Sequence, residues 1–226
     1  MLLLALLLAA DAASPGLRPT DTGALAGKVT LAGLAPQLAT LPVTRDMKVC
    51  GTSKPDESLE VRDAGVKNAV IWFPDLSEPK EAKPARQKLD QIACAFSPHV
   101  LAAPVGAAVD VVNSDKALHN VRAQEGDTKL MNYAMPIPGH VVPTRMKKQG
   151  IFKVSCDVHP WMRAWILVLP NAKLAVTDEK GAFRIEGVPP GKHKIKIWHE
   201  RLGEKEAEVE ISAEKTAKHD VEYTPR

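Results

Sequence analysis

The chain has 226 residues, which is enough for one or two domains with a buried core. Its 30 lysine and arginine residues nearly balance 27 aspartate and glutamate residues, so the formal net charge is only +3, and the basic residues do not cluster along the sequence. Because a nucleic-acid partner needs a basic face, we expect no such partner.

The first thirteen residues predict a secretory signal peptide. Residues 2–8 are leucine and alanine, a run too short to span a bilayer. Ala10-Asp11-Ala12 fits a cleavage site made of small residues. The usual basic start is missing, and a buried apolar segment is the alternative. We expect a periplasmic or secreted protein with no transmembrane segment in the mature chain that follows residues 1–13.

The first part of the chain reads as short strands. Residues 24–31 form an apolar run that ends before a turn at Gly33, and residues 59–63 alternate apolar and polar side chains. Residues 68–73 are rich in β-branched and aromatic side chains, which fits a buried strand. Residues 77–88 are highly charged and contain two prolines, which is typical of a linker.

Strand patterns resume after the linker and lead into two loops with metal-binding side chains. Residues 109–112 are rich in valine and run toward the loop that carries His119. Residues 150–156 alternate toward a second loop, which begins at Cys156. Residues 165–169 form an apolar run typical of an interior strand.

The C-terminal part predicts β-hairpins. Lysines alternate with apolar residues along one run and glutamates do so along the next, after a glycine turn (Lys192, Lys194, Lys196; Glu206, Glu208, Glu210). Because every second side chain shares one face of a strand, pairing would set lysines against glutamates, worth about a few tenths of a kcal/mol per pair. No segment predicts a long helix, so we expect an all-β fold.

Three candidate metal donors share one short loop. Cys156, His159 and Met162 follow at intervals of three residues, and His119 adds a second imidazole from another strand. Two histidines, one cysteine and a weak axial methionine are the ligands of a blue-copper electron-transfer site. We therefore predict one copper ion here. The alternatives are plain core packing or zinc, which rarely recruits methionine; whether His99 is a further ligand stays open.

The cysteine count bears on disulfide bonding. In an oxidising compartment, three cysteines suggest one bridge and one thiol with another role. If Cys156 binds metal, Cys50 and Cys94 remain, and we expect a disulfide between them. Two buried free thiols are the alternative.

The metal motif and its surroundings resemble a known family. The matching segments are Cys94-x-Phe96-x-Pro98, Val105-Gly106, Asn113-x-Asp115, His119-Asn120-Val121, Gly150 and the Cys156-x2-His159-x2-Met162 loop. They are similar to the cupredoxins, small Greek-key β-sandwiches, and the short loop is most similar to that of amicyanin. The segments around Cys94 and Cys156 also resemble secreted bacterial proteins of the methylamine-utilisation or plastocyanin-like type. The resemblance implies a copper domain over residues 83–169.

The two flanks resemble a second family, the carboxypeptidase regulatory-like (transthyretin-like) β-sandwich. The matching segments are Gly27-Lys28-Val29 and Asn68-Ala69-Val70 before the copper motif, and residues 175–183 and 188–191 after it. This resemblance implies one split domain, residues 23–82 with 170–226, that carries the cupredoxin as an insert. Three modules in series are the alternative.

The cupredoxin resemblance implies a one-electron carrier, not an enzyme, with a redox partner such as a c-type cytochrome or an oxidoreductase. It also implies that Asn120 ties its loop to the one that carries Cys156, while Pro160 limits loop motion. We expect an exposed edge of His159 where the partner docks. An apolar rim would surround that edge (Trp161, Met135, Pro136).

Three other functions remain open. The same ligands would suit a copper storage or delivery protein that exchanges its metal readily. An enzyme of the copper nitrite reductase type would need a second copper, for which the sequence shows no clear ligand group. Finally, the split sandwich could be a scaffolding module with a fused copper domain.

Overall fold

The computed structural model describes residues 21–77 and 84–225. Within that part of the chain the regular structure is almost wholly β-strand, with one short helix, α1 (Met47–Cys50), which confirms the predicted all-β class. No helix there is long and apolar enough to cross a membrane. The predicted signal peptide, residues 1–13, and part of the predicted linker lie outside the described residues.

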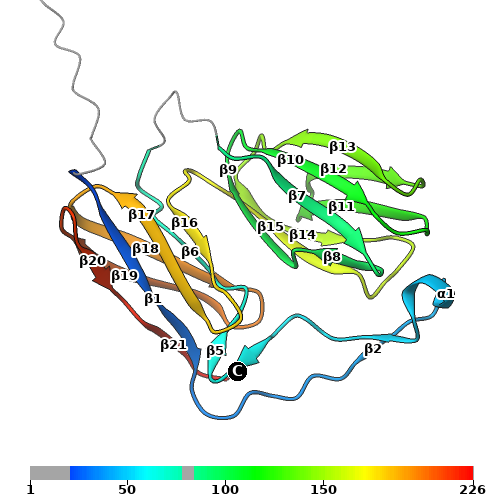
Figure 1. Ribbon diagram of the computed structural model, residues 1–226, viewed down its shortest axis with the longest axis horizontal. Helices are drawn as coiled ribbons and strands as arrows, with labels where there is room; N and C mark the ends of the chain where they lie inside the picture. Colours follow the sequence, from blue (N-terminus) through cyan, green and yellow to red (C-terminus); the bar gives the residue numbers. More distant parts are fainter. Residues whose placement is uncertain (1–20, 78–83, 226) are drawn as a thin grey trace, which may run out of the picture.

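The strands form two β-sandwiches, which appear side by side in Figure 1. The first sandwich takes its strands from both ends of the described chain. One of its sheets contains β1 (Gly23–Leu31), β4 (Val61–Arg62), β5 (Gly65–Val66), β17 (Ala182–Val188), β20 (Thr216–Lys218) and β21 (Val221–Tyr223). The other contains β6 (Val70–Trp72), β16 (Leu174–Val176), β18 (Gly191–His199) and β19 (Gly203–Ile211). Leu25, Ile71 and Ile195 belong to the apolar cluster of this sandwich.

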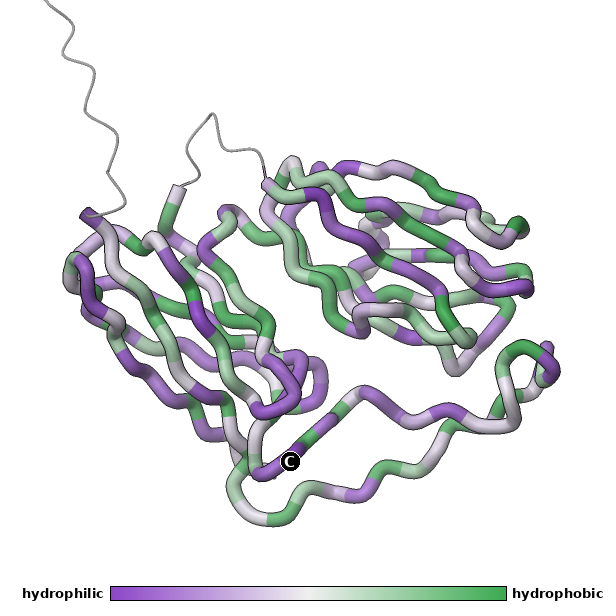
Figure 2. The backbone as a smooth tube through the Cα atoms, in the orientation of Figure 1, coloured by the Kyte–Doolittle hydropathy of each residue, from purple (hydrophilic) through white to green (hydrophobic). Residues whose placement is uncertain are grey.

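Strands β18 and β19 pair in the register that the charge pattern predicts. The lysines lie directly opposite the glutamates (Lys192 and Glu210, Lys194 and Glu208, Lys196 and Glu206). Nζ of Lys196 lies 3.0 Å from Oε1 of Glu206. Figure 2 shows hydrophilic and hydrophobic residues alternating along the strands. The apolar members of the alternation, such as Ile195 and Ile197, enter the core.

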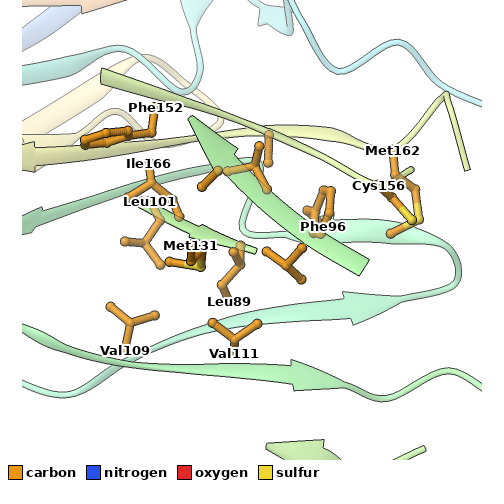
Figure 3. Close-up of a cluster of buried hydrophobic side chains, with 14 of the residues drawn as sticks. Leu89, Phe96, Leu101, Val109, Val111, Met131, Phe152, Cys156, Met162 and Ile166 are labelled. Atoms are coloured by element: carbon orange, nitrogen blue, oxygen red, sulfur yellow. The ribbon is translucent and has the colours of Figure 1, made fainter. Parts of the chain in front are cut away.

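The second sandwich comes from the middle of the chain. One sheet contains β7 (Gln87–Ile92), β8 (Ala95–Ser97), β10 (Ala108–Asn113) and β13 (His140–Arg145). The other contains β9 (Val100–Pro104), β11 (His119–Glu125), β12 (Thr128–Met135), β14 (Gly150–Ser155) and β15 (Arg163–Leu169). Its core includes Leu89, Val111, Phe152 and Ile166 (Figure 3). Cys156 and Met162 lie in the same apolar cluster, so the predicted metal loop is part of this core.

The first sandwich is closed by pairings across a long sequence gap. Strand β1 pairs with β17, and β6 pairs with β16 and β18, although the whole second sandwich lies between them in the chain. Oγ1 of Thr177 adds two buried hydrogen bonds of this kind, accepting from Ala69 N–H at 2.9 Å and donating to Val66 O at 2.7 Å. The assignment of residues 23–82 with 170–226 to one split domain, and of residues 83–169 to an insert, stays a prediction, as does the resemblance of this sandwich to the carboxypeptidase regulatory-like family.

An apolar seam joins the two sandwiches. Val70 and Trp198 from the first sandwich pack with Val100 and Leu167 from the second. The rings of Trp165 and Trp198 meet edge to face across this seam, with centroids 5.2 Å apart. The two sandwiches therefore share a buried contact as well as the chain connections.

A long connection leaves the first sandwich and reaches the second. This segment, residues 32–57, is called the strap from here on; it contains β2 (Leu41–Pro42), α1 and β3 (Ser53–Lys54), and Figure 1 shows it in blue to cyan, running from β1 out to α1 and back. Strands β2 and β3 pair with each other. The expected disulfide between Cys50 and Cys94 is present and bonds the strap to the second sandwich. Val43 of the strap also packs into the second core.

Candidate metal centre

The predicted donors are carried by the ends of neighbouring strands. His119 is the first residue of β11. Cys156 directly follows β14, and Met162 directly precedes β15, so the loop between these paired strands carries Cys156, His159 and Met162. The backbone N–H of Met162 donates to the carbonyl of His159 at 2.9 Å, which closes the loop into a tight turn.

Three of the four predicted donor atoms converge. Nδ1 of His119 lies 2.9 Å from Nδ1 of His159, and Sγ of Cys156 lies 3.8 Å from the latter nitrogen. The three ligand atoms all lie within 4.8 Å of one another, and the three residues are buried. Met162 is buried in the same cluster, and Figure 3 shows it at the same end of the core as Cys156.

Each histidine of the cluster has a carboxylate behind it. Nε2 of His119 donates to Oδ2 of Asp115, and Nε2 of His159 donates to Oδ2 of Asp46, both at 2.9 Å. A carboxylate on one ring nitrogen fixes the proton there and leaves the lone pair of the other nitrogen for a metal. Here both free lone pairs belong to the two Nδ1 atoms that face each other. Two lone pairs at this separation require a proton or a metal ion between them.

The electrostatic setting of His119 favours the neutral ring. Burial lowers the pKa of His119, the hydrogen bond to Asp115 raises it again, and the nearby His159 lowers it; the net result is a lowered pKa. Since a histidine must be unprotonated at the ligating nitrogen to bind a metal, a lowered pKa favours binding near neutral pH.

Polar contacts connect the loops around the sulfur. The N–H of Asn120 points to Sγ of Cys156 at 3.4 Å, and Oδ1 of Asn120 accepts a hydrogen bond from Asp157 N–H at 2.7 Å. These contacts join the loop of His119 to the loop of Cys156. Pro160, which stands in the turn after His159, is exposed.

The expected docking rim differs from the structure. His159 has no exposed edge, because Asp46 of the strap lies over its Nε2 and the ring is fully buried. Met135 is also fully buried, Trp161 is only 7% exposed, and Pro136 alone of the three predicted rim residues lies on the surface. The sequence does not reveal this burial, since the covering segment belongs to a distant part of the chain.

Trp161 lies against the donor cluster inside the protein, whereas His99 lies outside that cluster. The ring of Trp161 packs on that of His159 with centroids 4.9 Å apart, and its Nε1 donates to the carbonyl of Cys94 at 3.1 Å. His99 lies outside the donor cluster; it hydrogen-bonds Glu200 of the first sandwich. Burial alone would lower the pKa of His99, but Glu200 and Glu57 raise it above its usual value.

The side chains fit a copper ion by their chemistry. Two imidazole nitrogens, a thiol and a thioether form a mixed set of borderline and soft donors, which suits both Cu(I) and Cu(II). All three cysteines lie in the described residues, and Cys156 is the one that forms no disulfide. No sequence motif marks Asp46 or the role of Asp115 as a partner of His119. The spacing of four residues between Asp115 and His119 is a local signal, whereas Asp46 precedes His159 by 113 residues.

Comparison with known proteins gives partial likenesses only. No family model and no curated protein matches the chain. Among solved structures, a Cu-containing nitrite reductase (NirK) from Thermus scotoductus is 24% identical with a TM-score of 0.34; the match covers 42% of this chain and 25% of the reductase chain.

Two smaller proteins match over nearly their whole length. A purple cupredoxin from Nitrosopumilus maritimus is 22% identical, with a TM-score of 0.31 and coverage of 36% of this chain and 98% of its own. A methionine-to-alanine mutant of amicyanin, in the Cu(I) state, is 20% identical, with a TM-score of 0.33 and coverage of 43% of this chain and 97% of its own. Because the sequence identities and TM-scores are low, the function proposed below rests on the side chains of this chain.

Proposed function

We propose that this protein binds one copper ion through His119, Cys156, His159 and Met162 and carries single electrons between redox partners. One observation carries the proposal: the ligand atoms of His119, Cys156 and His159 lie within 4.8 Å of one another in a buried cluster. Bound copper would supply a one-electron couple. The chain would supply a mixed donor set that strongly disfavours neither oxidation state and a rigid loop that limits rearrangement between them.

Burial of the ligands favours a carrier over a copper delivery protein. A delivery site needs ligands that a partner can reach, but both histidines are fully buried and Cys156 is nearly so.

An enzyme of the nitrite reductase type would require a second metal site. In residues 21–77 and 84–225, both groups of candidate ligands include His119, and the second group uses Cys94, which is already bonded to Cys50. We therefore favour a carrier.

We further propose that the protein works outside the cytoplasm, as a predicted signal peptide and a buried disulfide suggest. Its partner would be a protein such as a c-type cytochrome or an oxidoreductase. The electron would leave through Trp161, because this ring packs on His159 and also lines a cavity of about 250 Å³ together with His99 and Arg163. The role of the first sandwich as a scaffold stays a second proposal.

The first test is the absorption spectrum of the purified protein with one equivalent of Cu(II). We expect the intense visible band of a copper–thiolate bond, and we expect Cys156→Ser to abolish it. His193→Gln, which changes a half-buried histidine of the first sandwich, should keep the band. A colourless protein that holds oxidised copper would refute the proposal.

The second test separates a carrier from a delivery protein. Stopped-flow mixing of the Cu(I) form with oxidised cytochrome c should show fast electron transfer, and Trp161→Leu should slow it. A delivery protein would instead lose its Cu(I) rapidly to a chelator and react slowly with the cytochrome.

A further inference from the structure

We propose that Asp46, carried by the strap of the first sandwich, is a positioning residue for the metal ligand His159, so that the metal centre is completed by a segment from outside its own sandwich. The proposal rests on the proposed copper function. It adds a residue that the donor motif does not contain and a structural role for the strap.

The hydrogen bond is the first observation. Oδ2 of Asp46 accepts from Nε2 of His159 at 2.9 Å, although 113 residues separate the two. With the proton held on Nε2, Nδ1 of His159 can face Nδ1 of His119 and Sγ of Cys156 as a lone pair. Without Asp46, the described contacts leave this fully buried Nε2–H with no acceptor, which is costly.

The backbone of Asp46 is a second, independent observation. Asp46 stands at the N-cap of α1, where an aspartate side chain ordinarily accepts a hydrogen bond from the first turn. It makes no such bond, and its side chain reaches His159 instead. Its φ of 49° and ψ of 35° are left-handed values that a residue other than glycine adopts at a cost. Local cost at a residue that touches a metal ligand fits a functional role.

The strap is anchored on both sides of Asp46. Val43 packs into the core of the second sandwich on one side, and Cys50 is bonded to Cys94 on the other. In addition, the N–H of Val43 donates to the carbonyl of Thr52 at 3.1 Å, which closes the segment into a loop. These anchors hold the Asp46 carboxylate in place even though the side chain is about half exposed, at 48%.

The Asp46 carboxylate should affect both the reduction potential of bound copper and the access of a partner to His159. It adds a negative charge next to the ring of His159, which stabilises Cu(II) relative to Cu(I). It also covers the edge of the ring, so a partner reaches the centre by another side. Because the loss of such an outer partner typically weakens metal binding 10- to 100-fold, we expect about that loss of Cu(II) affinity in Asp46→Ala, with a smaller loss in Asp46→Asn, which keeps an acceptor oxygen.

The test uses the full chain with three variants: Asp46→Ala, Asp46→Asn and the control Lys48→Gln. Lys48 lies on the same helix and is exposed, so its change alters the charge nearby without touching His159. In metal-free protein, nitrogen NMR should show His159 Nε2–H protected from exchange in the wild type and in Lys48→Gln. We expect this protection to be lost in Asp46→Ala.

The Cu-loaded proteins give a second readout. Cu(II) affinity should fall in Asp46→Ala, and the reduction potential should rise in both Asp46 variants but not in Lys48→Gln. If Asp46→Ala shows the same Nε2–H exchange, Cu(II) affinity and reduction potential as the wild type, the proposal is overturned. If the wild type binds no copper, the copper function fails, whereas the NMR result still decides the role of Asp46. A thiol assay for the Cys50–Cys94 bond shows whether the alanine variant is misfolded. If it is, the same measurements on Asp46→Asn decide the role of Asp46.

Discussion

Replacement of His199 should make the protein more resistant to acid. His199 ends β18 and is 1% exposed. Its Nδ1 accepts a hydrogen bond from Arg201 N–H at 3.2 Å, and it also hydrogen-bonds the backbone of Lys67. Burial lowers the pKa of His199 from 6.5 to about 4, with the charges of His99 and Arg201 acting in the same direction and Glu200 against it. The ring is therefore neutral in the folded protein.

The sign and size follow from proton linkage. Between pH 6.5 and about 4, the unfolded chain binds a proton at His199 and the folded chain does not, so the folded state loses stability as the pH falls through this window. The difference in pKa between the unfolded and folded states corresponds to at most about 3 kcal/mol in the free energy of unfolding. Between about pH 7.5 and about pH 4.5, roughly 2.5 kcal/mol of it should be lost. The raised pKa of His99 acts in the opposite direction, since its contribution is present at low pH and is lost as the pH rises.

The assay is urea denaturation of metal-free wild type and His199→Gln at these two pH values, because metal release would add its own pH dependence. Glutamine is polar and has no proton to gain in this range. The drop in the free energy of unfolding should be smaller in His199→Gln by about 2.5 kcal/mol. His219→Gln, a change of the same kind at a half-exposed position, should behave as the wild type. An identical drop in the wild type and His199→Gln would refute the reasoning.

Two further changes should lower stability for different physical reasons. The double variant Cys50→Ala/Cys94→Ala removes a bond across 44 residues, which should lower the free energy of unfolding by about 4 kcal/mol in urea denaturation; an unchanged midpoint would contradict this. Thr177→Val leaves the buried Ala69 N–H without its acceptor, at a cost of about 1–3 kcal/mol. Thr216→Val, at an exposed site, is the control, and equal stability of the two threonine variants would show that the buried bonds contribute little.

The sequence predicts those features whose physical cause is local. The alternation of lysines with apolar residues is enough to place Lys194 opposite Glu208, because a strand presents every second side chain to one face. The Cys156 to Met162 spacing likewise holds its donors on one turn. The disulfide followed from a count of three cysteines and the assignment of Cys156, and that pairing is present.

The features that the sequence does not predict depend on packing between distant segments. An exposed edge of His159 is a fair expectation for a loop residue, but burial is set by whatever segment lies above it. Here that segment is the strap, whose residues show no periodic pattern that would place it on the second sandwich. The resemblance places Met135 at the docking rim, but Met135 is the last residue of β12 and its side chain packs in the core of the second sandwich.

The strap makes metal binding and the fold of the whole chain depend on each other. The proposed centre needs His119 and the loop from Cys156 in the second sandwich, and Asp46 from a segment that both begins and ends in the first. Such coupling is reciprocal: a docked strap that favours the metal-ready form of His159 must itself be held more firmly once a metal is bound. The Cys50–Cys94 bond keeps the strap near the centre and so reduces the entropy that docking would otherwise cost. Loss of this bond should therefore weaken copper binding even though neither cysteine is a ligand, and Cu(II) titration of the double alanine variant measures that loss; unchanged affinity would show that the strap docks without help.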